Sequence, residues 1–166
     1  MQTFLPYADY SATAAVLDNQ RLNKQALEAW QIMMTLLALD PAGDYREPKG
    51  WRNHPAVKLW RGHESALLDY TGAMVAEWVS RGYKSTIYDK AQATYEVAML
   101  RGLVNDNQPA EQPEWANDPS FLDRFTSSHR TALLAKNYEW YKQFNWPEDT
   151  GVAPETYEYI WQNEGK

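Results

Sequence analysis

The sequence contains no cysteine and no long apolar run. Without cysteine, neither a disulfide framework nor a thiolate zinc site can form. Nowhere do about 18 apolar residues follow one another, so no membrane-spanning helix is expected. The opening stretch MQTFLPYADY lacks the basic flank and apolar core of a secretory signal. We therefore expect a soluble, intracellular (cytoplasmic) protein.

Positive charge is also scarce, because 16 Lys and Arg face 22 Asp and Glu and leave a net charge of −6. This weakens a nucleic-acid-binding interpretation, since phosphate binding needs positive potential. The cations are nevertheless concentrated in three segments, residues 21–24, 49–61 and 130–142. The acidic residues gather in three others, residues 40–48, 105–119 and 146–159. The net charge therefore does not exclude a local basic surface.

What the chain does contain is material for a core, with 44% apolar and 14% aromatic residues, so disorder is not expected. Apolar residues recur with helical spacing in three segments, Ala12 to Leu39, His63 or Glu64 to Ser80, and Ile87 to Leu103. Asp9 or Ser11 could cap the first helix, and Ser127 or Ser128 a short fourth one.

The segments between these helices are rich in Pro, Gly, Asn and Asp, which predicts an ordered loop over residues 40–55 and a surface loop over 105–119. The chain shows no strand alternation, no repeat and no second composition regime. The sequence therefore predicts an all-α fold, a compact single-domain helical bundle over residues 1–166 with long ordered loops. We expect it to be a monomer.

The stretch RLNKQALE places polar groups within an otherwise apolar helix. Arg21, Lys24, Gln25 and Glu28 share one face, with Lys24 and Glu28 one turn apart. One interpretation is a solvated face carrying an ordinary Lys–Glu pair. The other is a polar face presented to a cleft, because the helix continues as a largely apolar rod.

A second cluster, GWRNHPAVKLWRGHE, interleaves cations with aromatic residues. Arg52, Asn53, His54 and Arg61 would suit phosphate contacts, and the tryptophans would suit base stacking. The alternative is a structural loop whose tryptophans fill the core. The three histidines lack the spacing of metal ligands, so we expect neither a metal nor another cofactor.

The third cluster, SSHRTALLAKNYEWYKQF, combines a basic helix with an aromatic run. Candidate DNA contacts here are His129, Arg130, Lys136, Trp140, Tyr141 and Lys142. The alternative is that aromatic residues this dense near a terminus close the core. No nucleophilic triad, phosphate-binding loop or dinucleotide motif accompanies them.

Taken in order, these segments resemble the pyrimidine-dimer DNA glycosylase/AP lyase family, the phage endonuclease V of ultraviolet repair. LDNQRLNKQALE is similar to the family's first helix, with Glu28 at the catalytic glutamate. NHPAVKLWRGHESALLDYTGAMVAEWVSRGY, SHRTALLAK and WYKQF are similar to its later segments. The resemblance covers residues 1 to about 146, and it rests on the order and spacing of motifs that are individually weak.

The resemblance implies an N-terminal segment threaded between helices, with its α-amine attacking the deoxyribose C1′ of a damaged nucleotide. An imine forms and β-elimination then cleaves the strand. An α-amine, ordinarily titrating near pH 8, is partly neutral at neutral pH, and a neighbouring carboxylate can stabilise the sugar cation and move protons. The resemblance further implies a bacterial or phage protein whose substrate is double-stranded DNA with a damaged or modified pyrimidine.

The chain departs from the family at its first residues, because Gln2 is too large for ready removal of Met1. The nucleophile would then be the Met1 amine, with Lys24 beside Glu28 as the rival. The alternatives to base excision are a group transfer onto a modified pyrimidine in phage DNA and a non-catalytic DNA-binding module on the same fold. The residues predicted to contact DNA are Arg21, Gln25, Arg52, Asn53, His54, Arg61, His129, Arg130, Lys136, Trp140, Tyr141 and Lys142.

Overall fold

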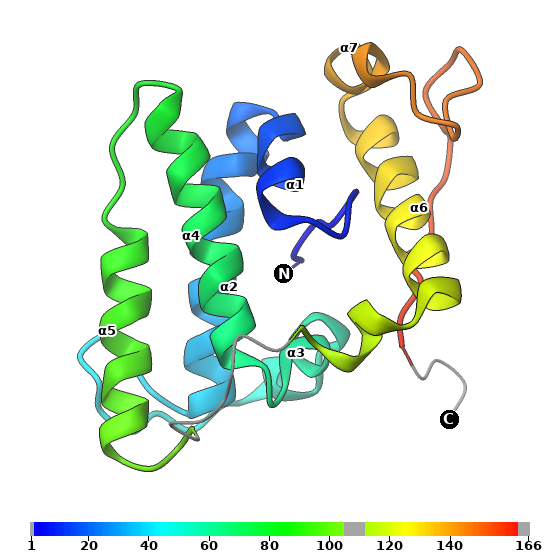
Figure 1. Ribbon diagram of the computed structural model, residues 1–166. Helices are drawn as coiled ribbons and strands as arrows, with labels where there is room; N and C mark the ends of the chain where they lie inside the picture. Colours follow the sequence, from blue (N-terminus) through cyan, green and yellow to red (C-terminus); the bar gives the residue numbers. More distant parts are fainter. Residues whose placement is uncertain (1, 105–111, 163–166) are drawn as a thin grey trace.

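A computed structural model describes residues 2–104 and 112–162 (Figure 1). Within these residues the regular structure is helical, and strand pairing is limited to an isolated bridge between Leu39 and Tyr45. The all-α prediction is therefore confirmed. The elements are α1 (Tyr10–Val16), α2 (Asn19–Leu37), η1 (Gly50–Asn53), α3 (Pro55–Trp60), α4 (Glu64–Ser80), α5 (Ile87–Leu100), η2 (Glu114–Asn117), α6 (Pro119–Lys136), α7 (Tyr138–Tyr141) and η3 (Lys142–Phe144).

The first predicted helix is in fact two helices, α1 and α2, separated by extended backbone at Leu17 and Asp18. Asp9 caps α1 as expected, accepting a hydrogen bond from the backbone nitrogen of Ala12 at 2.7 Å. The break is fixed by Asp18, which is buried and exchanges hydrogen bonds with the Tyr141 hydroxyl. Apolar spacing continues across these two residues, so it did not reveal the break.

The other helix predictions differ from the structure mainly at their ends. Helix α4 has the predicted bounds, and Gly82 follows it with a φ of +96°, a conformation that favours glycine. Helix α5 ends at Leu100 rather than Leu103. The prediction of a short helix from Ser127 or Ser128 was wrong, because α6 already begins at Pro119 behind an Asp118 cap. Proline is compatible with the first position of a helix, where its missing N–H has no intrahelical partner.

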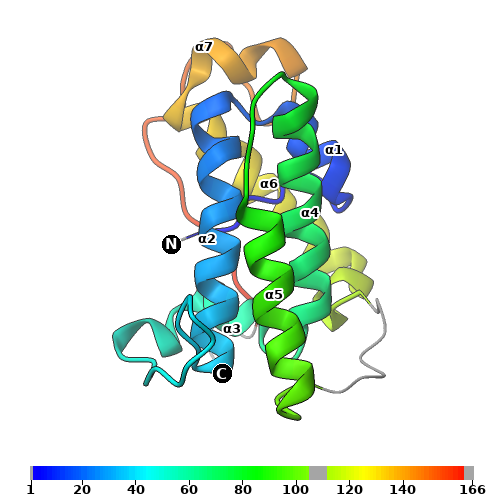
Figure 2. The same cartoon turned by 90° about the vertical axis from the view of Figure 1, so that its left-hand side faces the viewer.

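Helices α2, α4 and α5 lie side by side, with α4 running opposite to the other two, whereas α6 stands apart from them (Figures 1 and 2). The N-terminal segment, residues 2–9, passes through the space between. It is bound from both sides, since Phe4 N donates to Gln25 on α2 and Leu5 N donates to His129 on α6, each at 2.7 Å. This confirms the threaded arrangement expected from the resemblance.

The C-terminal tail, residues 145–162, returns along α6 toward the same space (Figure 1). Its first part is anchored by Glu148, which pairs with Arg130 on α6 at 2.6 Å. Farther along, Ile160 N donates to the Ser128 hydroxyl at 3.3 Å. The predicted loop at 105–119 falls partly on residues 105–111, which lie outside the described residues.

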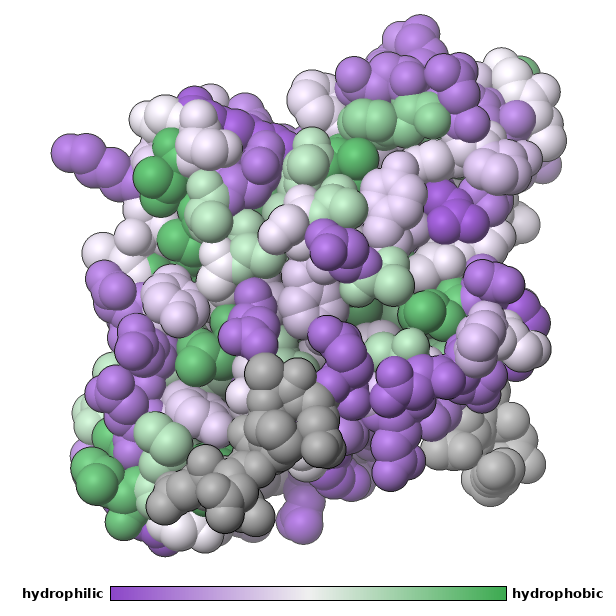
Figure 3. Space-filling view, in the orientation of Figure 1, coloured by the Kyte–Doolittle hydropathy of each residue, from purple (hydrophilic) through white to green (hydrophobic). Residues whose placement is uncertain are grey.

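The core joins all of these elements, with Trp60, Tyr70, Phe125 and Tyr141 among its fully buried side chains. On the face shown in Figure 3, hydrophobic residues occur in small groups between hydrophilic ones. None of the helices in the described ranges combines the length and the apolar character needed to cross a membrane.

Candidate active site

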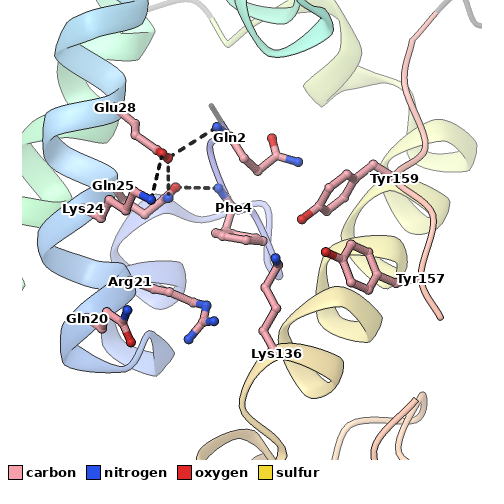
Figure 4. A pocket seen from close by; sticks show the side chains of 10 residues that line it. All are labelled: Gln2, Phe4, Gln20, Arg21, Lys24, Gln25, Glu28, Lys136, Tyr157 and Tyr159. Carbon is pink, nitrogen blue, oxygen red and sulfur yellow. Dashed lines mark hydrogen bonds and ion pairs between the residues drawn. The ribbon is translucent and has the colours of Figure 1, made fainter. Parts of the chain in front are cut away.

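A pocket of about 340 Å³ opens between α2, the N-terminal segment, the end of α6 and the C-terminal tail (Figure 4). Its lining combines charged, amide and aromatic side chains. They are Gln2, Phe4, Gln20, Arg21, Lys24, Gln25, Glu28, Lys136, Tyr157 and Tyr159. The polar face predicted from RLNKQALE therefore faces a cleft, not open solvent.

Glu28 is the carboxylate of this pocket, and three groups hold it in place. Its Oε2 accepts hydrogen bonds from the backbone nitrogen of Gln2 at 3.3 Å and from Gln25 Nε2 at 3.1 Å. Its Oε1 lies 3.9 Å from Lys24 Nζ. The Glu28 side chain is only 12% exposed, so its electrostatic effect is screened less by water than that of a surface carboxylate.

Gln25 fixes the geometry around Glu28 from inside the protein. The side chain is buried, and its Oε1 accepts hydrogen bonds from Phe4 N at 2.7 Å and from the Tyr70 hydroxyl at 2.9 Å. With the oxygen committed to two donors, the amide nitrogen is directed toward Glu28. One buried amide therefore ties the N-terminal segment to the carboxylate.

Cations outnumber carboxylates in the pocket lining, although the chain as a whole is acidic. Arg21 forms an ion pair with Asp18 at 3.3 Å, and its guanidinium points into the pocket (Figure 4). The Lys136 ammonium lies 5.0 Å from the centre of the Tyr157 ring. This local excess of positive charge suits a polyanionic ligand despite the net charge.

Two further hollows continue from this pocket along α2. The first, of about 430 Å³, shares Glu28 and is also lined by Arg46 and the exposed Trp51. The second, of about 370 Å³, shares Thr35 with the first. Its lining includes Tyr45, Arg52 and Arg61. Because neighbouring hollows share Glu28 and Thr35, we refer to the three together as the groove along α2.

The GWRNHPAVKLWRGHE segment therefore combines both interpretations offered by its sequence. Trp60 is fully buried and serves the core, whereas Trp51 is 52% exposed on the groove. Arg52 and Asn53 are exposed, and Arg61 donates to the backbone oxygen of Arg52 at 2.9 Å.

His54 has a structural role in the same segment. Its Nδ1 accepts a hydrogen bond from the backbone nitrogen of Ala56 and thereby caps α3. Burial lowers the pKa of His54, which favours the neutral ring that this hydrogen bond requires.

For His129 and Tyr141 the prediction of DNA contact was wrong, because both side chains are fully buried. His129 accepts a hydrogen bond from Leu5 N, and burial lowers its pKa to about 3, so the ring is neutral at ordinary pH. Tyr141 holds the break before α2 through Asp18. His129 Nδ1 and the Tyr141 hydroxyl instead accept hydrogen bonds from buried backbone nitrogens, those of Leu5 and Asp18.

Three other predicted contacts lie outside the pocket and are engaged with the protein itself. Arg130 pairs with Glu148 and also donates to the backbone oxygen of Pro6 at 2.8 Å. Trp140 Nε1 donates to the Val16 oxygen at 2.8 Å. Lys142 pairs with Glu139 at 2.7 Å.

The residues predicted from the sequence did not include Gln2, Phe4 and Gln20, nor the two tail tyrosines, Tyr157 and Tyr159. The signal for the tyrosines was the alternation in ETYEYIW, because alternate side chains of an extended segment share one side. Met1 lies outside the described residues. Within the described ranges, no group of three or more His, Asp or Glu side chains could hold a metal ion.

A helical domain that holds a carboxylate against its own N-terminal segment, within a cationic groove, has the features of a DNA-acting enzyme. The sequence pattern of pyrimidine dimer DNA glycosylases matches residues 1–91, and the chain belongs to that family. Its function is accordingly of the DNA glycosylase kind, with DNA as substrate. No curated protein and no solved structure matches the chain. The matched part contains the N-terminal segment and Glu28, whereas α6 and the tail lie beyond it.

Proposed function

We propose that this glycosylase extrudes a damaged or modified pyrimidine from double-stranded DNA, releases it through an imine and then cleaves the strand as an AP lyase. The observation that carries the proposal is the 3.3 Å contact between Glu28 Oε2 and the backbone nitrogen of Gln2. It sets the carboxylate beside the residue that follows the N-terminal amine in the chain. Met1 itself lies outside the described residues, so its amine enters as part of the proposal.

The reaction needs a neutral amine and a group that handles protons. The amine attacks C1′, the bond from C1′ to the base breaks, and the base leaves with a proton. The C1′–O4′ bond of the sugar ring then opens, O4′ takes a proton, and the nitrogen lone pair forms the protonated imine to C1′. Removal of a C2′ proton then expels the 3′ phosphate by β-elimination. Glu28 would stabilise the positive charge that develops at the sugar and move these protons.

Lys24 is a weaker candidate for the nucleophile. Its side chain is 68% exposed, and its ammonium lies 3.9 Å from Glu28 Oε1. A lysine in its ammonium form has no lone pair for attack. An N-terminal amine is generally less basic than a lysine amine and is therefore more often neutral at neutral pH.

The groove along α2 supplies a path for the DNA strand on either side of Glu28. Arg52 and Arg61 are exposed at its far end, and Arg46 and Trp51 lie between them and the carboxylate. Guanidinium groups in such a row suit successive phosphates, and an exposed tryptophan suits stacking on a base. The extruded nucleotide would occupy the pocket beside Glu28, where the base is accessible to chemistry.

The test is borohydride trapping on a duplex that carries one abasic site, followed by peptide mapping of the adduct. We expect a covalent adduct on the peptide that contains residue 1, and intact mass of the purified protein defines that residue beforehand. A Lys24→Ala variant should still form the adduct, on the same peptide as the wild type, whereas a short extension before residue 1 should abolish trapping. An adduct on Lys24, or none with a free N-terminus, would contradict the proposed mechanism.

A further inference from the structure

The wall of the pocket opposite α2 is formed by the C-terminal tail. Tyr157 and Tyr159 reach the pocket from this segment, and their hydroxyl groups point into it (Figure 4). Both lie beyond the part of the chain that the family pattern matches. The tail therefore adds aromatic surface and hydrogen-bonding groups to a site whose carboxylate comes from α2.

The tail is held in this position by packing behind Tyr159. The centre of the Tyr159 ring lies 5.5 Å from the centre of the His129 ring and 6.3 Å from that of the Phe4 ring, each pair in an edge-to-face arrangement. The next residue, Ile160, is hydrogen-bonded to Ser128 on α6. Burial raises the pKa of Tyr159 to about 12, so its hydroxyl keeps its proton at neutral pH.

Gln2 contributes an unsatisfied donor at the same wall. The residue is 9% exposed, and its Oε1 accepts a hydrogen bond from Thr3 N at 2.9 Å. Its Nε2 is buried and makes no hydrogen bond of ordinary length to the described residues, although it lies close enough to the Tyr159 hydroxyl to lower the pKa of that group. The amide points from the N-terminal segment toward Tyr159 (Figure 4). A buried donor without an acceptor is costly, and an oxygen atom of a ligand would satisfy it.

These groups match the chemistry of a pyrimidine base. The edge of the base carries carbonyl oxygens that accept hydrogen bonds from hydroxyl and amide donors, and its face stacks on aromatic rings. We propose that Tyr157, Tyr159 and Gln2 recognise the damaged or modified pyrimidine while Glu28 acts at its sugar. This inference rests on the proposed function, and it assigns base recognition to the tail wall.

The test compares two duplexes of the same sequence, one with a single thymine dimer and one with an abasic site at that position. Only the duplex with the thymine dimer presents a damaged base. A variant that no longer recognises the base should therefore lose more of its rate of base release on that duplex than of its rate of strand cleavage at the abasic site. Tyr159→Phe should lower single-turnover base release roughly 3- to 10-fold through one lost hydrogen bond. Tyr157→Ala should lower it roughly 10-fold or more through lost stacking.

The matched control is Tyr88→Phe, because Tyr88 is a half-buried tyrosine on α5 that packs against Gly72 instead of the pocket. It should leave the ratio of the two rates unchanged. Circular dichroism and thermal unfolding confirm that each variant is folded before rates are compared.

The outcomes separate this inference from the proposed function. Equal losses on the two duplexes in folded tail variants, or no loss on either, would overturn the assignment of base recognition to the tail. A wild-type protein that acts on neither duplex would instead contradict the proposed function, and the inference with it.

Discussion

The two walls of the pocket are built in different ways. On the α2 wall, Arg21, Lys24, Gln25 and Glu28 lie within two turns of one helix, where backbone hydrogen bonds fix their relative positions. On the tail wall, Tyr157 and Tyr159 lie on a segment without regular structure, held by contacts behind it. The first wall is rigid by its secondary structure, whereas the second depends on tertiary contacts.

This difference indicates a division of labour. The groups that act on the sugar must hold their positions to within a fraction of an ångström, which a helix face provides. A base-recognising surface can vary with the lesion, and a tail fixed by side-chain packing can vary without disturbing α2. The experiments that follow separate the two walls, beginning with the largest expected effect.

Removing the negative charge of Glu28 from the α2 wall should have the largest effect on the reaction. Glu28→Gln should slow single-turnover base release roughly 10²-fold or more, because the sugar cation and its protons lose their partner. Thermal unfolding should change little, since an amide of the same shape replaces the carboxylate. The matched control is Glu77→Gln, which breaks another half-buried ion pair, with Arg81 at 3.0 Å, at the far end of α4. A Glu28→Gln enzyme with near wild-type rate would remove this carboxylate from the mechanism.

The α2 wall could be predicted from the sequence because helical spacing alone brings residues three and four apart onto one face. The tail wall could not, because its partners lie far away in the chain: Tyr159 packs on Phe4 and His129. The alternation in ETYEYIW places both tyrosines on one side of the tail, but it does not report which part of the fold that side faces. The error at His129 has the same origin, since a polar residue on a basic helix looks like a surface group until Leu5 N is found beside it.

The ends of the helices show the same limit of prediction from local sequence. The helices α4 and α5 could be located from apolar spacing, which reports burial along one element. The break between α1 and α2 depends on a hydrogen bond from a residue more than a hundred positions away, Tyr141. Long-range contacts of this kind determine how α6 and the tail close over the N-terminal segment.

Detaching the tail from α6 should lower the free energy of unfolding. Arg130 joins α6 to the tail through Glu148 and to the N-terminal segment through Pro6. Arg130→Ala leaves the Glu148 carboxylate and the Pro6 oxygen without this donor, and we expect a loss of roughly 2 kcal/mol in the free energy of unfolding. Urea unfolding at pH 7 measures it. Lys142→Ala, which breaks an exposed ion pair with Glu139, is the control and should cost far less.

Because Arg130→Ala would free the tail from α6, we also expect this variant to react more slowly. Base release should fall more than cleavage at an abasic site, as for the tail tyrosines. If Arg130→Ala is as stable as the wild type, the ion pair does not hold the tail.

The contacts that α6 makes with the N-terminal segment and the tail should also weaken in mild acid. His129 accepts a hydrogen bond from Leu5 N, packs against Tyr159, and has its pKa lowered by burial to about 3 from an ordinary value of 6.5. Between these values the unfolded chain binds the proton and the folded protein does not, so stability falls as pH falls. The slope approaches about 1.4 kcal/mol per pH unit below pH 6.

His129→Asn tests this slope, since the amide oxygen can still accept from Leu5 N while the group no longer titrates. The difference in unfolding free energy between wild type and variant should shrink from pH 6.5 to pH 5. His54 is present in both proteins, so its own lowered pKa cancels in the comparison. A difference that stays constant with pH would show that His129 is not held neutral.

The smallest effects are expected outside both walls, in the groove that would carry the DNA strand. Arg52 and Arg61 are exposed there, and each change to Ala should reduce the salt dependence of duplex binding by about one counterion. Lys84→Ala is the control, because this exposed lysine follows α4 and lines none of the three hollows along α2. The losses should be the same for damaged and undamaged duplexes, since phosphate contacts carry no information about the base. Binding titrations at several salt concentrations measure the slope. If both arginine variants keep the slope of the parent, the strand does not follow this groove.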